Sequence, residues 1–317
     1  MRTIIQNATI VNEGRKFAGS VVLEDDFIQE VIEGDVDSTQ TYDTVIDATG
    51  LYLMPGVIDD HVHMREPGLT HKADIASESR TAAAGGVTSY MEMPNTVPQT
   101  TNIEQLEEKF RIAAEKSRVN YSFFFGATNS NVDSLQQLDR TRVPGVKVFM
   151  GSSTGNMLVD DECALRKLFE TSPLLLMAHC EDTRIIENNI KAFKKKYKGQ
   201  SDFPVRYHSR IRDVEACYSS SSLAVKLAKE TGARLHIAHV SSKRELELFD
   251  NTLPLEEKKI TAEAVIAHLM FSTEDYDRLG TKIKCNPSVK NPEDKAALRE
   301  ALTNGLIDVV ATAHDPN

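Results

Sequence analysis

The stretch Pro55-Gly56-Val57-Ile58-Asp59-Asp60-His61-Val62-His63-Met64 marks the point at which the pattern of the chain changes. Before it, β-rich runs are broken by the turn signals Asn12-Glu13-Gly14, Glu24-Asp25-Asp26 and Ala48-Thr49-Gly50, and no helical period is present. After it, apolar runs of strand length alternate with amphipathic, charged stretches of helix length. We therefore predict a small β module over residues 1–54 and a larger α/β domain over residues 55–317.

Eight apolar runs of the larger domain have the length and composition of strands. They are Val57–Met64, Thr88–Met93, Tyr121–Ala127, Val146–Met150, Leu174–Cys180, Arg234–Val240, Ile260–Ala267 and Asp308–Ala313. The helical stretches between them include Ile103–Ser117, Asp161–Thr171, Asp213–Thr231 and Pro292–Asn304. Alternating strands and helices predict a parallel sheet, and eight such units fit a (β/α)₈ barrel, which takes about 250 residues.

A doubly wound open sheet is the main competing architecture, but no G-x-G-x-x-G motif follows an early strand. The sequence stops at Asn317, just after the eighth predicted strand. We therefore expect the eighth helix and the C-terminal part of the barrel to be missing from this chain.

Composition narrows the class of partner. The chain has 37 Lys and Arg against 47 Asp and Glu, a formal net charge of −10, which argues against nucleic acid or an anionic membrane as the main partner. No apolar run reaches the roughly 18 residues that a membrane helix needs, and the start lacks the pattern of a signal peptide. The four cysteines form no C-x-x-C pair, so we expect the protein to lie in a reducing cytoplasm. As its partner we expect a small-molecule substrate.

Histidines recur where predicted strands end. His61 and His63 are two residues apart, so they point to the same side of a strand and can share a metal at the mouth of a barrel. His179 and His239 each close a later apolar strand and are followed by polar residues. In a closed barrel these strand ends face one opening, which predicts a metal site there, although each histidine alone is more often a packed rim residue.

Lys147 lies between Val146 and Val148 in a predicted barrel strand. A lysine in such a place is costly unless it has a partner or reaches solvent at the strand end. Burial and nearby cations would both lower the pKa of its amine. A neutral amine can add carbon dioxide, and the resulting carbamate can bridge two metal ions.

Taken together, these features resemble the cyclic amidohydrolase branch of the amidohydrolase superfamily, and dihydroorotase most closely. The resemblance rests on Pro55–Gly68, which contains a His-x-His-x-Arg-x-Pro-Gly run, on Met93-Pro94-Asn95-Thr96, and on the segments around Lys147, His179 and His239. It covers essentially the whole chain. Hydantoinases and allantoinases share the His-x-His pair and the lysine, but usually lack an arginine at the place of Arg65.

The resemblance implies two zinc ions, one on His61 and His63 and one on His179 and His239, bridged by carboxylated Lys147. The reaction implied is the reversible interconversion of N-carbamoyl-L-aspartate and dihydroorotate in pyrimidine biosynthesis, using a water acidified between the metals. Manganese or cobalt would also suit such ligands.

Three further residues are expected to bind the substrate. Arg65 can hold the free carboxylate of the substrate with its planar guanidinium. Asn95 would hydrogen-bond the same end, and Asn286, before Pro287, would contact the substrate as similar Asn-Pro segments do in relatives. The loop Gly151–Gly155 has the small residues of a mobile βα loop, and a lid that closes on the substrate is the sharper hypothesis for it.

The end of the chain departs from the family. The signature Asp-His-Ala-Pro-His of the eighth strand is here Ala313-His314-Asp315-Pro316-Asn317, so Ala313 stands where the family has its metal-binding, proton-shuttling Asp. Asp315 is the remaining candidate for the catalytic acid, although it lies about 6.6 Å further along an extended strand. Because general acid–base catalysis is typically worth about 10²–10⁴-fold, the sequence as it stands predicts a metal-binding fold with weak or no turnover.

Two alternatives remain open. One is another cyclic amidohydrolase, acting on hydantoins, dihydropyrimidines or allantoin. The other is a non-catalytic, dihydroorotase-like subunit that scaffolds aspartate transcarbamoylase; Ala313 favours it, while the intact candidate ligands oppose it. A homodimer is a further arrangement that the sequence leaves open.

Overall fold

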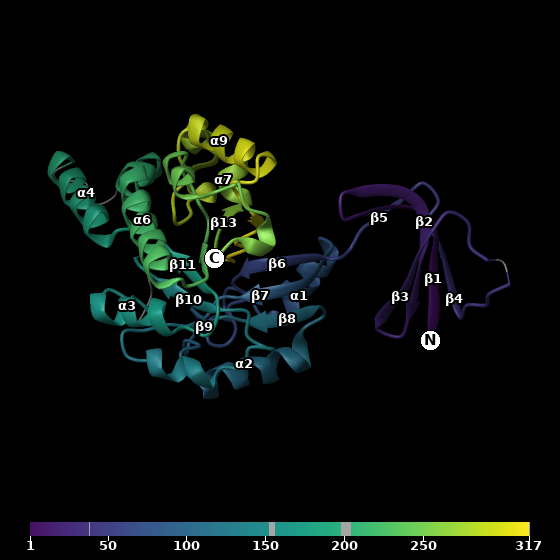
Figure 1. Cartoon of the computed structure of the whole chain (residues 1–317). Coiled ribbons are helices and arrows are strands. Elements are labelled where there is room, and N and C mark those ends of the chain that lie inside the picture. Colours follow the sequence, from purple (N-terminus) through teal and green to yellow (C-terminus); the bar gives the residue numbers. More distant parts are fainter. Residues whose placement is uncertain (38, 152–155, 198–203, 317) are drawn as a thin grey trace. The chain divides into compact units, whose positions relative to one another are not determined.

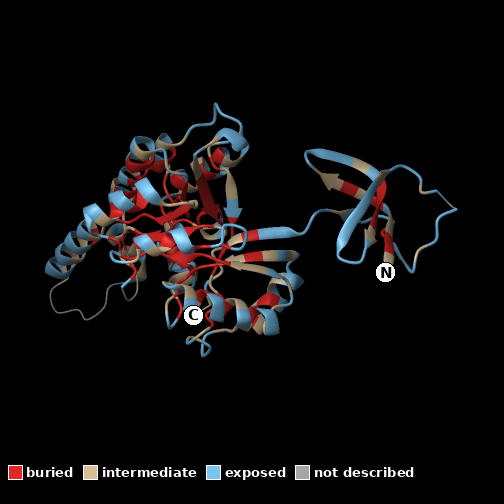
Figure 2. Ribbon diagram, turned by 60° about the horizontal axis from the view of Figure 1, so that its bottom comes forward, coloured by how far each residue is buried: buried red, intermediate tan, exposed pale blue. Residues whose placement is uncertain are grey.

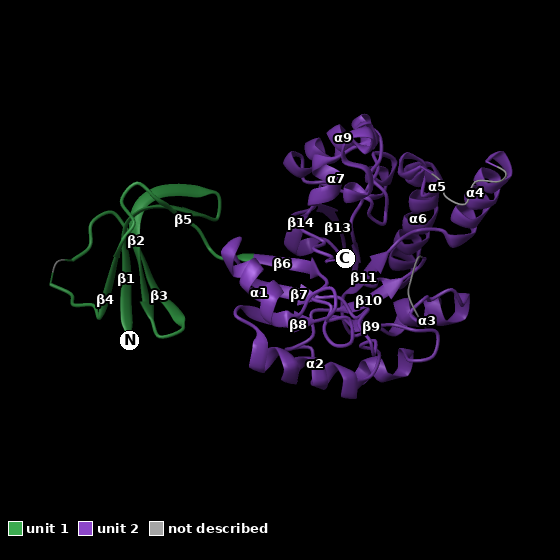
Figure 3. Ribbon diagram, turned by 180° about the vertical axis from the view of Figure 1, so that it is seen from behind, with its two compact units in different colours: residues 1–57 green, residues 58–317 purple. Residues whose placement is uncertain are grey.

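The computed structural model describes residues 1–37, 39–151, 156–197 and 204–316. By their internal contacts these form two compact units, Met1–Val57 and Ile58–Asn317 (Figure 3). The sequence placed the corresponding boundary at residue 54. Most of the predicted loop Gly151–Gly155 lies outside the described residues, as does Asn317.

The first unit is a five-stranded sheet. Its strands are β1 (Arg2–Asn12), β2 (Arg15–Glu24), β3 (Phe27–Glu33), β4 (Thr44–Asp47) and β5 (Tyr52–Leu53). The order is β3-β2-β1-β4, with β5 also paired to β1. Two antiparallel hairpins join the first three strands, whereas β4 and β5 run parallel to β1. The buried cluster of this sheet is small, and large side chains such as Phe27 and Ile28 are exposed.

The second unit is a parallel barrel of eight strands. They are β6 (Val57–Val62), β7 (Val87–Glu92), β8 (Asn120–Phe123) with β9 (Phe125–Gly126), β10 (Val146–Phe149), β11 (Leu176–His179), β12 (Leu235–Ile237), β13 (Ile260–Val265) and β14 (Val309–Ala311). β8 and β9 together form the third barrel strand, interrupted only at Phe124.

Two short links close the ring. Phe124 N–H donates to Glu92 O and Phe125 N–H to Gly145 O, which joins the β6-β7-β8 sheet to the β9–β14 sheet. At the other seam, Val62 forms a parallel bridge with His314, and His63 N–H donates to His314 O at 2.8 Å. The eight predicted strands are therefore confirmed, and the closed ring excludes the doubly wound alternative.

The α-helices lie mostly outside the ring of strands (Figure 1). They are α1 (Ile75–Ala84), α2 (Ile103–Lys116), α3 (Glu162–Thr171), α4 (Thr183–Lys196), α5 (His208–Ile211), α6 (Val214–Thr231), α7 (Ile266–Met270), α8 (Tyr276–Leu279) and α9 (Pro292–Thr303). Most long helices begin after a residue whose side-chain oxygen accepts a hydrogen bond from the first turn of the helix. These capping residues are Asp74, Asn102, Asp161, Asp182 and Asp213.

The short 3₁₀ turns are η1 (Val132–Gln137), η2 (Val205–Tyr207), η3 (Arg244–Leu248), η4 (Leu255–Glu257), η5 (Thr273–Asp275) and η6 (Gly280–Ile283). The main core lies between the strands and the surrounding helices, where Figure 2 shows the buried residues concentrated. A second cluster fills the inside of the ring, with Met93, Phe124, Met177 and Ala238. No helix in the described part of the chain is long and apolar enough to span a membrane.

Candidate metal centre

The four predicted histidines meet at the carboxyl ends of β6, β11 and β12. The His61 ring lies 5.7 Å from that of His63 and 5.4 Å from that of His239, between ring centres. His179 and His239 are in direct contact, with 2.9 Å between His179 Nδ1 and His239 Nε2. Strand ends from three distant parts of the chain thus place four imidazoles in one continuous cluster, which we call the histidine cluster.

Lys147 of β10 reaches into the histidine cluster. It is only 1% exposed, and its amine has no hydrogen-bond partner among the described residues. Its positive charge lowers the pKa of each of the four histidines, which places the amine close to all of them. Burial lowers the pKa of Lys147 itself to about 8, although the charge of Glu263 opposes this.

Burial also lowers the pKa of every histidine in the cluster. The rings are therefore neutral at pH 7, and a neutral imidazole offers one nitrogen lone pair to a metal. Four neutral imidazoles beside an unpartnered amine form a donor set suited to zinc and similar divalent cations.

Two carboxylates that the sequence did not single out orient these histidines. Glu263 Oε1 of β13 lies 2.9 Å from His61 Nδ1 and accepts the His239 N–H at 2.8 Å. Because Nδ1 of His61 faces a carboxylate, its Nε2 is left for a metal, the arrangement usual for metal-binding histidines. The sequence carried a usable signal, since Glu263 is a charged residue between two alanines of an apolar strand.

Glu181 plays the corresponding part for His179. Its Oε2 lies 3.0 Å from His179 Nε2 and also pairs with Arg212. Burial alone would raise the pKa of Glu181, but its hydrogen bond with His179 and the nearby cations lower it to about 2. Both nitrogens of His179 are thus engaged, so a metal on this ring would replace its contact with His239.

The predicted substrate residues are distributed unevenly. Arg65 and Asn95 both lie near His63, since the charge of the first lowers the pKa of His63 and a hydrogen bond with the second raises it. The buried Asn95 Oδ1 itself has no partner of good geometry among the described residues. Gly68 (φ +82°) allows the loop after β6 to lie close against the loop after β7, because a Cβ at this position would lie only 1.9 Å from Val97 O. Asn286 is exposed, and its Oδ1 lies 3.1 Å from Nε2 of His208.

At the end of β14, Asp315 pairs with Arg65, whose Nε also donates to Pro316 O at 2.9 Å. The structure thus places the candidate acid Asp315 on the residue expected to bind the carboxylate of the substrate. Ala313, at the place of the family Asp, has a φ of +48°. This left-handed conformation is unfavourable for alanine and better tolerated by Asp or Asn.

Backbone strain gathers at the same end of the barrel. In the described part of the second unit, the non-glycine residues with positive φ are Arg65 (+68°), His239 (+41°) and Ala313 (+48°). Each such residue costs on the order of 1–3 kcal/mol and persists only where the surroundings enforce it. All three lie at the ends of strands that carry candidate site residues, as is typical of functional sites.

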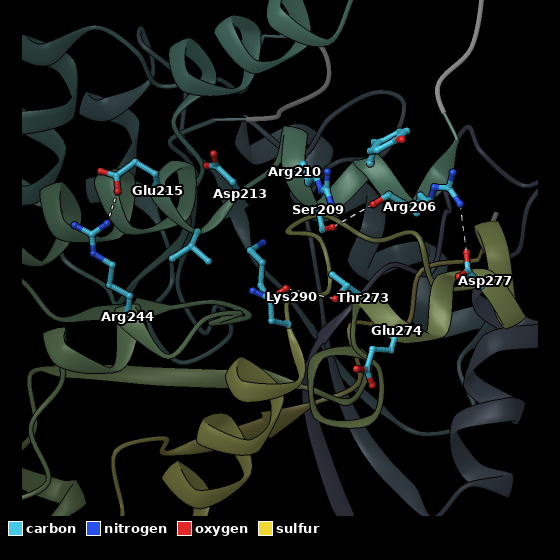
Figure 4. A pocket seen from close by; sticks show the side chains of 13 residues that line it. Arg206, Ser209, Arg210, Asp213, Glu215, Arg244, Thr273, Glu274, Asp277 and Lys290 are labelled. Atoms are coloured by element: carbon cyan, nitrogen blue, oxygen red, sulfur yellow. Dashed lines mark hydrogen bonds and ion pairs between the residues drawn. The ribbon is translucent and has the colours of Figure 1, made fainter. Parts of the chain in front are cut away.

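A cavity of about 840 Å³ lies among the loops that follow β11, β12 and β13 (Figure 4). Its charged lining includes the ion pairs Arg244–Glu215 and Arg206–Asp277. None of the predicted metal or substrate residues lines it. The cavity is therefore separate from the histidine cluster.

Several known proteins resemble this chain over most of its length. Residues 50–245 match the family model described as dihydro-orotase-like. A dihydroorotase from Methanosarcina mazei is 33% identical over 286 residues, which cover 87% of this chain and 60% of that protein. An allantoinase from Salmonella choleraesuis is 29% identical over 324 residues, covering 99% of this chain and 69% of that protein.

Among solved structures, the L-hydantoinase from Arthrobacter aurescens superposes with a TM-score of 0.88 at 26% identity, covering 98% of this chain and 69% of that one. The chain thus spans between 60% and 69% of the length of these relatives. The predicted barrel and the predicted resemblance are confirmed. The chain belongs to the dihydroorotase-like family, within the cyclic amidohydrolases.

Proposed function

We propose that the protein is a dihydroorotase that interconverts N-carbamoyl-L-aspartate and dihydroorotate with two zinc ions bridged by carboxylated Lys147. The observation that carries the proposal is the buried, unpartnered amine of Lys147 among four neutral imidazoles. A fold that buries such an amine without a hydrogen-bonded carboxylate has prepared it for a ligand.

The donor set fits a binuclear centre. His61 and His63 would hold one ion, and His179 and His239 the other. The amine of Lys147 would first lose a proton; the neutral amine would then attack the carbon of carbon dioxide, forming an N–C bond and losing a second proton, so that a buried cation becomes a carbamate anion. Two divalent cations, when bound, would supply an acidified water and polarise the amide carbonyl. Glu263 and Glu181 hold the rings of His61 and His179 in place.

Arg65 supports a substrate that carries a free carboxylate. In the structure its guanidinium already holds a carboxylate, that of Asp315, beside His63. A planar guanidinium binds carboxylates in this way with high geometric specificity. N-carbamoyl-aspartate and dihydroorotate both have such a group, whereas hydantoin, dihydrouracil and allantoin do not. We further propose Asn95 and Asn286 as substrate contacts and a cytoplasmic location, in keeping with four unpaired cysteines.

The proton-transfer step is the weak point of this sequence. Ala313 offers no carboxyl group, and Asp315, which we retain as the candidate acid, is engaged by Arg65. We therefore expect slow turnover that Ala313→Asp raises by about 10²–10⁴-fold. A scaffold for aspartate transcarbamoylase is the second candidate function, and Ala313 is the observation that favours it.

The test combines metal analysis with a substrate panel on the full chain and on Ala313→Asp. We expect zinc in the histidine cluster, and hydrolysis of dihydroorotate in preference to hydantoin, dihydrouracil and allantoin. Arg65→Ala should abolish that preference, while the matched control Arg111→Ala, an exposed arginine paired with Glu108, should not.

A folded chain without metal in the cluster would contradict the proposal. Preference for a substrate without a carboxylate, unaffected by Arg65→Ala, would identify another cyclic amidohydrolase. An Ala313→Asp protein that binds zinc but stays inactive, and instead binds aspartate transcarbamoylase, would support the scaffold.

A further inference from the structure

Three side chains that are not part of the histidine cluster converge inside the barrel: Asp60 of β6, His236 of β12 and Glu263 of β13. Each offers one donor atom within 4.8 Å of the others. His236 Nε2 lies 3.8 Å from Asp60 Oδ2 and 3.6 Å from Glu263 Oε2. Zinc bonds of about 2.1 Å in a tetrahedron place neighbouring ligand atoms about 3.4 Å apart, close to these two separations.

His236 is set up as a metal ligand. Its side chain is 4% exposed, and its Nε2 has no hydrogen-bond partner among the described residues. Its other nitrogen, Nδ1, lies 2.8 Å from the hydroxyl of Thr261. When Nδ1 donates to that hydroxyl, the lone pair of Nε2 points at the two carboxylates. A histidine whose second nitrogen is fixed by an outer partner is the usual form of a metal-binding histidine.

A protonated His236 between two carboxylates is the competing explanation. A charged N–H···O⁻ hydrogen bond measures about 2.7–2.9 Å, but both separations here are 3.6 Å or more. A buried N–H without an acceptor loses free energy of about 1–3 kcal/mol. Both separations are therefore longer than such a hydrogen bond and close to the spacing of two ligand atoms on one ion.

The charge balance points the same way. Asp60 and Glu263 repel each other in a buried setting, and the Oδ1 atom of Asp60 has no hydrogen bond. Lys147 is a cation whose charge reaches both carboxylates, and carboxylation would remove it. Since unpaired buried charges are costly, a divalent cation bound between the carboxylates would relieve this repulsion.

We propose that Asp60, His236 and Glu263 bind a third divalent cation, separate from the two of the histidine cluster. Glu263 connects the sites, because its Oε2 lies 3.6 Å from His236 Nε2 and 3.2 Å from His61 Nδ1, while its Oε1 lies 2.9 Å from His61 Nδ1. The third cation would fix Glu263 and, through it, the ring of His61. The charge argument rests on the carboxylated Lys147 of the proposed function, whereas the geometry of the three donor atoms does not.

The test uses the full chain, stripped with a chelator, reloaded with Zn²⁺ and crystallised. At the zinc absorption edge we expect an anomalous peak about 2.1 Å from His236 Nε2, besides the peaks of the histidine cluster. Thr261→Val should weaken binding of this ion by about 10–100-fold and leave the cluster ions in place. His236→Gln should hold one zinc fewer per chain than the wild type.

His268→Gln is the matched control for His236→Gln. His268 is as deeply buried as His236, and its Nδ1 has no hydrogen-bond partner among the described residues. Its Nε2 lies 2.9 Å from Pro287 O, and it is not one of the three converging donors. It should keep the wild-type zinc content. Peaks in the histidine cluster with none at His236 would overturn the third site alone. A peak at His236 with an empty cluster would support the third site and overturn the proposed function. The wild-type map decides even where a variant fails to fold.

Discussion

Two lysines of this barrel are buried to the same extent in opposite surroundings. Lys109 of α2 and Lys147 of β10 are each 1% exposed. The amine of Lys109 lies 2.8 Å from Glu92 Oε2 and donates to Met93 O at 3.2 Å. The amine of Lys147 has no hydrogen-bond partner among the described residues and lies over the ring of Phe149, 5.5 Å from its centre.

The difference distinguishes a buried lysine that has its partner within the fold from one that lacks a hydrogen-bond partner among the described residues. Glu92 also accepts the Met64 N–H, so the Lys109–Glu92 ion pair holds the end of β6 against β7. Each of its two buried charges has the other as its partner. The amine of Lys147 has no carboxylate in contact with it, and its neighbours are imidazole rings that carry lone pairs. Burial with a partner serves the fold, whereas burial without one indicates a site that a ligand completes.

The largest expected effect is on metal binding. Lys147→Met should lower the zinc affinity of the histidine cluster by more than about 100-fold, because loss of an outer partner alone costs about 10–100-fold. Lys109→Met should leave that affinity unchanged in the molecules that fold. Zinc titration against a chromogenic chelator measures both variants. Equal zinc affinity in wild type and Lys147→Met would erase the distinction between the two lysines.

The next effect is on the stability of the fold, and here the lysine whose loss lowers it is Lys109 and not Lys147. Lys109→Met should lower the free energy of unfolding by about 3–5 kcal/mol, because it leaves the carboxylate of Glu92 buried without its partner. Urea unfolding of the metal-free proteins measures this change, and circular dichroism follows it because the chain has no tryptophan. A loss below 1 kcal/mol would mean that the Glu92 pair contributes little to the fold.

The fold could be predicted because its signals are local. Apolar runs separated by helix-length segments gave all eight strands, and errors are confined to strand ends. The run Arg234–Val240, for example, contains a β12 of only three residues, Leu235–Ile237. His239 has a positive φ, which interrupts the regular strand conformation, and a conformation imposed by tertiary contacts leaves no mark in the sequence.

The site was predicted in part, for a related reason. A charged residue in an apolar strand is conspicuous, so Lys147 could be identified, and the same criterion applied to Glu263 would have found the carboxylate beside His61. Lys109 was hidden, because a lysine on an amphipathic helix reads as a solvent-facing residue. The contact of Asn286 with His208 depends on loop geometry, which strand periodicity does not encode.

A smaller effect concerns pH. Burial lowers the pKa of Lys147 from its ordinary 10.5 to about 8, so between these values the unfolded chain binds the proton more tightly than the folded one. The buried, protonated Lys147 therefore destabilises the metal-free protein fully below pH 8, and this destabilisation disappears as the pH rises to 10.5. Lys147→Met should stabilise the metal-free protein at pH 7 by on the order of 3 kcal/mol.

The measurement is urea unfolding of both metal-free proteins at several pH values. The difference between them should shrink toward zero as the pH approaches 10.5. A difference that does not change with pH would show that the amine finds a partner in solution, contrary to the contrast with Lys109.

The smallest effect tests whether charge or packing makes Lys109 structural. In Glu92→Gln/Lys109→Met both charges are gone, Gln keeps an acceptor for the Met64 N–H, and Met places a thioether near the Phe123 ring over which the Lys109 amine lies. Because replacing a buried ion pair by neutral groups of similar volume is often nearly neutral, the double variant should lie within about 1 kcal/mol of the wild type. A double variant as unstable as Lys109→Met would mean that the shape of the lysine, and not its charge, holds α2 against the strands. Both buried lysines would then be explained by packing, and the missing partner of Lys147 would no longer distinguish it.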